Sequence, residues 1–205
     1  SMFDDVAAYI PASVTAQLDG KTEDLIAYVV TPNYLNLVGI QPSIGRVLVP
    51  ADERAADPAV AVISYSLWRR RFASDPAIVG SSIVINHRSF TIVGVGPSRF
   101  SGTEPLLPDV WVTTSMQRTV LPPDDRFNDR SSEWLLVVGR LKPHVSRSVA
   151  AASLSGTAPH LATAFPGRGR PSAITVAPGT FFTLDPGIWP VIILVLSIVG
   201  LVLAI

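Results

Sequence analysis

The chain has 205 residues, with 16 Lys and Arg balanced by 16 Asp and Glu, and it has no cysteine. A formal net charge of zero argues against a nucleic-acid-binding protein, which would show a clustered basic excess. The 18 prolines and 14 glycines predict a loop-rich chain of short elements, but 48% hydrophobic residues are too many for a disordered one.

The first predicted element is a β-hairpin. The segment from Ser13 to Thr31 contains two strand-like runs around Asp19 and Gly20, a pair that favours a tight hairpin turn. The Gly-Lys-Thr that begins at Gly20 invites comparison with a phosphate-binding loop, but Thr15 stands where that loop needs a glycine. The sequence therefore predicts a turn at Gly20 and no nucleotide site.

Short helices and a buried strand are predicted next. Thr31 is expected to cap a short helix that ends at Gly39. The near-continuous apolar run at 59–64 predicts a buried strand, and Ser64 is expected to cap the following helix. One face of that helix carries Leu67, Trp68, Arg71 and Phe72.

Strands dominate the middle of the chain, where helical patterns are scarce. Runs at 82–85 and 90–95 predict a second hairpin, and the run at 109–114 predicts another strand. Further on, the segment 133–141 has the pattern of a buried strand. It is followed by an amphipathic helix that begins near Val145 and is weakened by Gly156 and Pro159, and by a closing strand at 174–177.

These elements predict an α+β fold. We expect residues 1–79 and 131–187 to form a split βαβ lobe and residues 80–130 to form an inserted β-rich lobe. Residues 188–205 carry no charge and no polar stripe, and at ~1.5 Å per residue they reach nearly across a ~30 Å hydrocarbon core. They predict the start of a transmembrane helix, whose spanning residues are Trp189, Val191, Ile192, Ile193, Leu194, Val195, Leu196, Ile198, Val199, Leu201, Val202 and Leu203.

The flank of this apolar segment indicates its orientation. Residues 171–187 contain no Lys or Arg, whereas cytoplasmic flanks are usually basic. The absence of cysteine also fits an oxidising compartment. We therefore expect residues 1–187 to lie outside the cytoplasm, next to the membrane. The acidic N-terminus has no secretory signal, so an upstream segment is expected to have carried the chain across.

No catalytic, cofactor-binding or metal-binding residue is predicted. The three histidines stand apart without zinc-ligand spacing, and Ser64 lacks the surroundings of a nucleophile. Two acidic groups could bind Ca²⁺ weakly but are interpreted as solvated loops. The three arginines at 69–71 are interpreted as a solvated face, with lipid headgroups or Asp75 as alternative contacts, and three tryptophans as core anchors. The acidic groups are Asp52, Glu53 and Asp57, then Asp124, Asp125 and Asp129; the histidines are His87, His144 and His160; the tryptophans are Trp68, Trp111 and Trp134.

Four sequence blocks resemble a known family. They are TPNYLNLVGIQPSIGR at 31–46, VAVISYSLWRRRF at 60–72, DPAIVGSSIVINHRSFTIVGVGPSRFSG at 75–102 and DVWV at 109–112. Their order and spacing resemble the periplasmic core domain of MacB/FtsX-like ABC transporter permeases. His87 stands where relatives often have a glycine after the asparagine, and both Asn and His tolerate left-handed backbone.

The resemblance implies a large extracytoplasmic loop between two transmembrane helices. Such domains are non-catalytic and couple ATP hydrolysis by a cytoplasmic ATP-binding subunit to movement outside the membrane, for export or mechanotransmission. It also implies a homodimer or a pseudo-dimer of permease halves, and a periplasmic adaptor is a possible further partner. The alternatives are a membrane-anchored binding or sensor domain and an anchored hydrolase. The sequence after Ile205 would discriminate between a permease and an anchored domain, because a permease is expected to have further apolar segments there.

Overall fold

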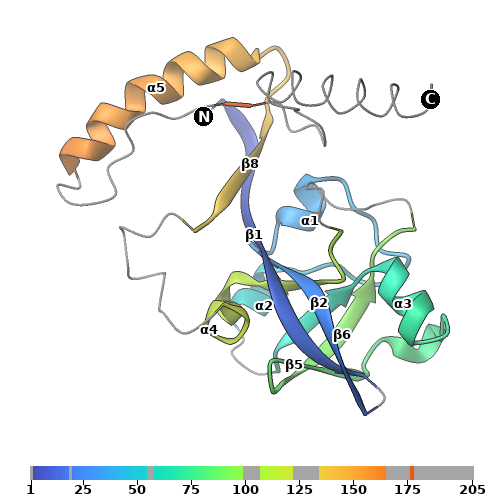
Figure 1. The fold of residues 1–205 in the computed structure, drawn as a ribbon. Coiled ribbons are helices and arrows are strands. Elements are labelled where there is room, and N and C mark those ends of the chain that lie inside the picture. Colours follow the sequence, from blue (N-terminus) through green and yellow to red (C-terminus); the bar gives the residue numbers. More distant parts are fainter. Residues whose placement is uncertain are drawn as a thin grey trace, which may run out of the picture.

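The computed structural model describes residues 2–18, 20–54, 58–98, 107–121, 134–164 and 176–177. These residues form one mixed sheet with few helices (Figure 1). In chain order the elements are β1 (Phe3–Leu18), β2 (Lys21–Val30), α1 (Tyr34–Leu37), β3 (Ile44–Gly45), α2 (Pro50–Arg54), β4 (Val60–Ile63), α3 (Tyr65–Arg71), the 3₁₀ turn η1 (Pro76–Ile78), β5 (Ser82–Ile85), β6 (Arg88–Val95), β7 (Val110–Thr113), η2 (Thr114–Met116), α4 (Gln117–Val120), β8 (Leu136–Leu141) and α5 (Arg147–Ala164).

Six of the strands close into a barrel. The hydrogen-bonded order is β2-β7-β4-β6-β5-β1, and β1 pairs again with β2, so the ring has no open edge. The pairs β2–β7 and β4–β6 are parallel, and the other four pairs are antiparallel. Closure removes the unpaired strand edges that would otherwise be open to other chains.

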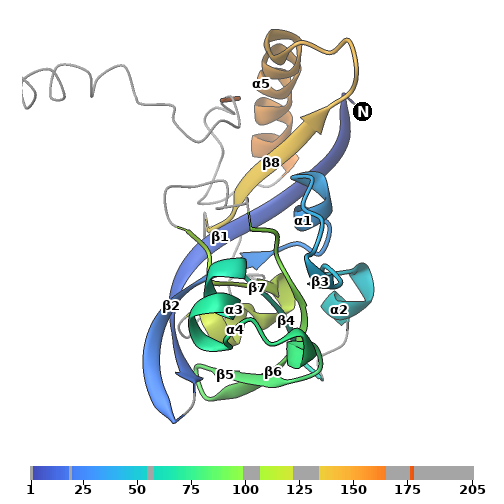
Figure 2. The ribbon, with the colours of Figure 1, turned by 90° about the vertical axis from the view of Figure 1, so that its right-hand side faces the viewer.

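Strand β1 belongs to two structures at once. Residues 9–18 pair with β2 and residues 16–17 pair with β5, which places this half in the barrel. The other half, from Phe3 to Tyr9, leaves the barrel and pairs with β8 as a two-stranded ribbon. Figures 1 and 2 show β1 running without interruption from the barrel into this ribbon. At ~3.3 Å per residue, its 16 residues span roughly 50 Å.

Apolar side chains on both faces of the strands form two cores. In β2, Ala27 and Val29 belong to the first cluster while Tyr28 and Val30 belong to the second. The same alternation along β4 and β7 explains why these strands have continuous apolar runs. The second cluster joins the barrel to the region of α1 and includes Ala7, Tyr9, Tyr28, Val30, Tyr34, Leu35, Leu37, Ile40, Leu48, Val60, Val62 and Trp111.

Both predicted hairpins are confirmed. β1 and β2 pair antiparallel around Gly20, which has a φ of +73° that favours glycine. β5 and β6 pair around Asn86 and His87, whose φ values of +46° and +66° are the left-handed pair of a tight primed turn. The Asn86 side chain holds this turn on the barrel, because its Oδ1 accepts from Thr15 N at 2.9 Å.

One predicted helix cap is confirmed and one is wrong. Ser64 caps α3, since its hydroxyl accepts from Leu67 N at 3.1 Å. Thr31 does not cap α1, which has Asn33 at the cap position without a side-chain hydrogen bond to the helix. The Thr31 hydroxyl instead accepts from Ala8 N at 3.0 Å, because the ribbon lies beside it.

The predicted lobe boundaries do not divide the sheet. In the ring, strands from the segment 80–130 alternate with strands of the other predicted lobe. β7 lies between β2 and β4, and the pair β6–β5 lies between β4 and β1. Strand β8 is also more exposed than its apolar pattern indicated, because β1 is its one strand partner among the described residues; Leu136 and Val137 are 46% and 69% exposed. Of the predicted closing strand, the structure describes Val176 and Ala177, and these residues belong to no strand.

Helix α5 differs from the predicted amphipathic helix. It continues through Gly156 and Pro159 without ending, and Val149 lies in solvent. Hydroxyl groups along it bond back to the carbonyl four residues earlier, as Ser155 does to Ala151 at 2.9 Å, which is a common local bond of Ser and Thr in helices. The residues predicted to span the membrane lie outside the described residues. Within the part of the chain that is described, no helix has both the length and the apolar character for a membrane crossing.

Candidate functional site

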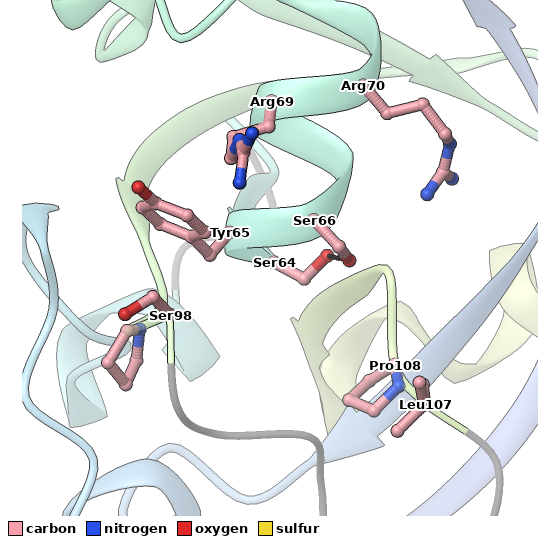
Figure 3. A pocket seen from close by; sticks show the side chains of 9 residues that line it. Ser64, Tyr65, Ser66, Arg69, Arg70, Ser98, Leu107 and Pro108 are labelled. Atoms are coloured by element: carbon pink, nitrogen blue, oxygen red, sulfur yellow. Dashed lines mark hydrogen bonds between the residues drawn. The ribbon is translucent and has the colours of Figure 1, made fainter.

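A concave surface lies beside the N-terminal end of α3. It has a volume of about 660 Å³ and collects residues from α3, from the segment after β6 and from the segment before β7. Figure 3 shows Tyr65, Arg69 and Ser98 along one side of the opening, with Leu107 and Pro108 on the other. The lining residues are Ser64, Tyr65, Ser66, Arg69, Arg70, Pro97, Ser98, Leu107 and Pro108.

Hydrogen bonds fix the walls of this concavity. Ser64 N donates to Asp109 O at 2.7 Å, which holds the start of α3 against the segment before β7. Gly96 N donates to Ile63 O at 2.8 Å and holds the end of β6 beside β4. At the other end of α3, Trp68 Nε1 donates to Asp75 O at 2.8 Å. The helix is thus held at both ends, so the side chains that it presents to the opening have a defined position.

Two of the three consecutive arginines on α3 form ion pairs, which corrects the predicted solvated face. Arg70 lies 3.4 Å from Glu23 and 3.1 Å from Asp109, and Arg71 also pairs with Glu23. The alternative contact with Asp75 is absent from the ion pairs of the described residues. Because the arginines are 45% and 39% exposed, each pair is expected to stabilise the fold by no more than about 1 kcal/mol. They join α3 to β2 through Glu23 and to the segment before β7 through Asp109.

Asp52 is buried in an ion pair, so its interpretation as part of a solvated loop is wrong. Its carboxylate accepts two bonds from Arg46, at 2.7 and 2.9 Å, and a third from Val49 N at 2.8 Å. Burial by itself would raise the pKa of Asp52. The bonds from Arg46 and Val49, with the charge of Arg46, outweigh burial and hold that pKa below its usual value.

We expect Asp52→Asn to lower the free energy of unfolding by about 2 kcal/mol at pH 7, because it removes the negative charge beside Arg46 and leaves one acceptor oxygen where two oxygens accept three bonds. The sign of the pH effect follows from the depressed pKa. The contribution is complete above the unfolded pKa of about 3.9 and is lost as the pH falls through the lower, folded value. Urea unfolding at pH 7 and pH 3 should therefore show a smaller difference between variant and parent at pH 3. Asp4→Asn, at an exposed aspartate, is the control; a difference that grows on acidification would contradict the prediction.

The described residues bring together no metal-binding group. No three His, Cys, Asp or Glu side chains among them are close enough to hold an ion. His87 lies in the β5–β6 turn, and His144 lies before α5 with a φ of +71°. Asp57 and the second predicted acidic loop lie outside the described residues. Trp68, Trp111 and Trp134 are buried, as predicted for core anchors.

The ribbon of β1 and β8 is tied to α1 by contacts that the sequence patterns did not reveal. Asn33 Nδ2 donates to Asp5 Oδ1 at 2.8 Å and to Val6 O at 2.9 Å. Arg140, on β8, donates to Leu37 O. Tyr9 packs on the rings of Tyr28 and Tyr34, with centroids 5.9 and 5.2 Å apart. These contacts join residues far apart in the sequence, and the Arg140 contact also depends on the register of β8 on β1.

Comparison with known proteins identifies the family. The family model of the MacB-like periplasmic core domain matches residues 1–157. The chain belongs to this family. No curated protein sequence matches the chain. Membership confirms the expected resemblance and assigns this MacB-like periplasmic core domain to the extracytoplasmic part of an ABC transporter permease, a generally non-catalytic part.

Solved structures share the fold of this MacB-like domain at low sequence identity. The periplasmic region of MacB from Actinobacillus actinomycetemcomitans has a TM-score of 0.59 at 18% identity, over 76% of this chain and 66% of that one. The extracellular domain of the ABC-type transporter YknZ from Gram-positive bacteria has a TM-score of 0.60 at 14% identity, over 83% and 80%. A domain of a permease protein from Porphyromonas gingivalis has a TM-score of 0.53 at 18% identity, over 78% and 65%.

Proposed function

We propose that this chain is the extracytoplasmic coupling domain of a MacB/FtsX-type permease. In this role it moves in response to ATP binding and hydrolysis by a cytoplasmic ATP-binding subunit, and it has no catalytic residue of its own. The observation that carries the proposal is the family match over residues 1–157. Residues 188–205 would enter the inner membrane as the start of a transmembrane helix, and two permease halves would act together as a dimer, with a periplasmic adaptor as a further partner.

The shape of the described residues supports a mechanical role. In Figures 1 and 2 the start of β1, the end of β8 and helix α5 lie at one end of the molecule, away from the barrel. β1 runs from that end into the barrel as one continuous strand. Since Asn33 and Arg140 tie the ribbon to α1, a displacement applied to the ribbon would move the barrel with it.

The link between the folded domain and the apolar C-terminal segment offers a test. Pro186 and Gly187 precede that segment, and proline limits the conformations that the link can adopt. Replacing this pair with a long Gly/Ser linker in the complete transporter is expected to leave ATP hydrolysis intact while transport is lost. These 205 residues contain no cysteine, so in a transporter whose other cysteines are replaced, Ser81→Cys, at an exposed position, gives one labelling site in this domain. Spin labels there should report a nucleotide-dependent change in the distance between permease halves that disappears in the linker variant.

The control variant carries the same Gly/Ser insert in the β1–β2 turn at Gly20, an exposed position remote from the ribbon. It should keep both transport and the nucleotide-dependent distance change. A linker variant that still transports and still shows the distance change would refute the coupling role.

A further inference from the structure

The concavity beside α3 carries a positive charge that the described residues do not balance. Glu23 pairs with both Arg70 and Arg71, and Asp109 Oδ1 pairs with Arg70. The other oxygen of Asp109 accepts from Ile26 N at 3.1 Å. Both acidic side chains that pair with α3 are therefore occupied. Arg69, which lines the concavity, has no ion-pair partner among the described residues.

The same concavity has an apolar wall. Leu107 is 60% exposed and lies next to Pro108, across the opening from Arg69 (Figure 3). Pro97 adds a second rigid ring, and Tyr65 is held by edge-on packing against Trp68 with ring centroids 5.4 Å apart. A single exposed leucine needs no explanation. Here, however, it shares with a cation a preformed volume within the ~300–1,000 Å³ range of ligand-binding pockets.

We propose that this concavity docks a short acidic and apolar segment of a partner protein on the same side of the membrane. A carboxylate of that segment pairs with Arg69, and a neighbouring aliphatic side chain covers Leu107 between Pro97 and Pro108. Charge complementarity selects the carboxylate, since among the described residues Glu23 and Asp109 already pair with Arg70 and Arg71. The separate apolar wall favours a peptide over a free inorganic anion, which would meet only one guanidinium without an ion-pair partner among the described residues.

The walls of the concavity are already fixed, which lowers the entropic cost of binding a segment there. Ser64, Trp68 and Gly96 already hold the walls by hydrogen bonds, so little ordering is needed when a segment binds. The inference does not depend on the coupling role proposed above, because docking is measured without ATP or transport.

The test uses the 205-residue chain in a nonionic detergent and a fluorescein-labelled pentapeptide, Gly-Leu-Glu-Leu-Gly, with its Gln counterpart. Fluorescence anisotropy should show saturable binding of the Glu peptide that weakens with added salt. Arg69→Gln is expected to weaken binding about tenfold, the loss of one charge-assisted hydrogen bond, and Arg69→Lys should restore part of it. Leu107→Ala should weaken binding of both peptides. Arg147→Gln, at an exposed arginine on α5, is the matched control and should bind as the parent does.

Three results would overturn the proposal. The first is no saturable binding of the Glu peptide, and the second is equal affinity for the Glu and Gln peptides or for parent and Arg69→Gln. The third is tighter binding of free octanoate at the same residues, which would assign the concavity to a small amphiphilic acid. Circular dichroism of each variant distinguishes loss of the site from loss of the fold.

Discussion

Gly94→Ala is expected to destabilise the barrel by about 3 kcal/mol or more, because it forces a methyl group into backbone atoms. Gly94 lies on β6 opposite Gly45 of β3. An added Cβ would lie 2.1 Å from Arg46 O and 2.9 Å from Arg46 N, and these backbone atoms cannot swing away as a side-chain end could. We expect urea unfolding, followed by circular dichroism, to give a strongly lowered midpoint.

The matched control for that variant is Gly156→Ala. Gly156 lies within α5, and no atom would meet its added Cβ within 4 Å. Since alanine favours a helix over glycine by up to about 1 kcal/mol, this change should be neutral or stabilising. Equal stability of the Gly94 variant and the parent would show that β3 does not approach β6 as closely as described.

Trp111→Ala is expected to cost about 3–5 kcal/mol of unfolding free energy, the usual range for deleting a large buried aromatic side chain. Trp111 is 1% exposed on β7 and belongs to the cluster that joins the barrel to the α1 region. Its ring passes close to Gly96, where an added Cβ would lie 3.2 Å from it. Thermal unfolding and near-ultraviolet circular dichroism would measure the loss of packing.

Leu107→Ala provides the comparison, because it removes an apolar side chain that is 60% exposed and four residues away in sequence. It should change stability by no more than about 0.5 kcal/mol. If the two variants had similar stability, the second cluster would not be a core. Trp111→Phe should fall between them, since it keeps an aromatic ring but leaves part of the space empty.

Local features of the fold could be predicted from the sequence because their causes are local. The Ser64 cap and the turns at Gly20 and at Asn86 each depend on neighbouring residues that favour one backbone conformation. The buried nature of β4 was also predictable, since both of its faces are apolar. The family resemblance rested on these same local features, and the comparisons confirmed it.

Long-range pairing could not be predicted in this way. Nothing in β5 or β6 indicates that these strands close a ring with β1 and β4, so a separate lobe was expected where one sheet exists. The apolar run of β8 indicated burial, but β8 has one strand partner among the described residues and stays exposed. At the concavity, the three arginines differ only through Glu23 and Asp109, which come from distant segments.

The double membership of β1 has a consequence for the order in which the protein assembles. Every strand of the ring lies before Leu121, so its pairings become possible once that much of the chain has been synthesised. β8 must then find the free half of β1 across more than a hundred residues, a contact of high sequence separation that forms slowly. We therefore expect the barrel to form before β8 pairs with the free half of β1.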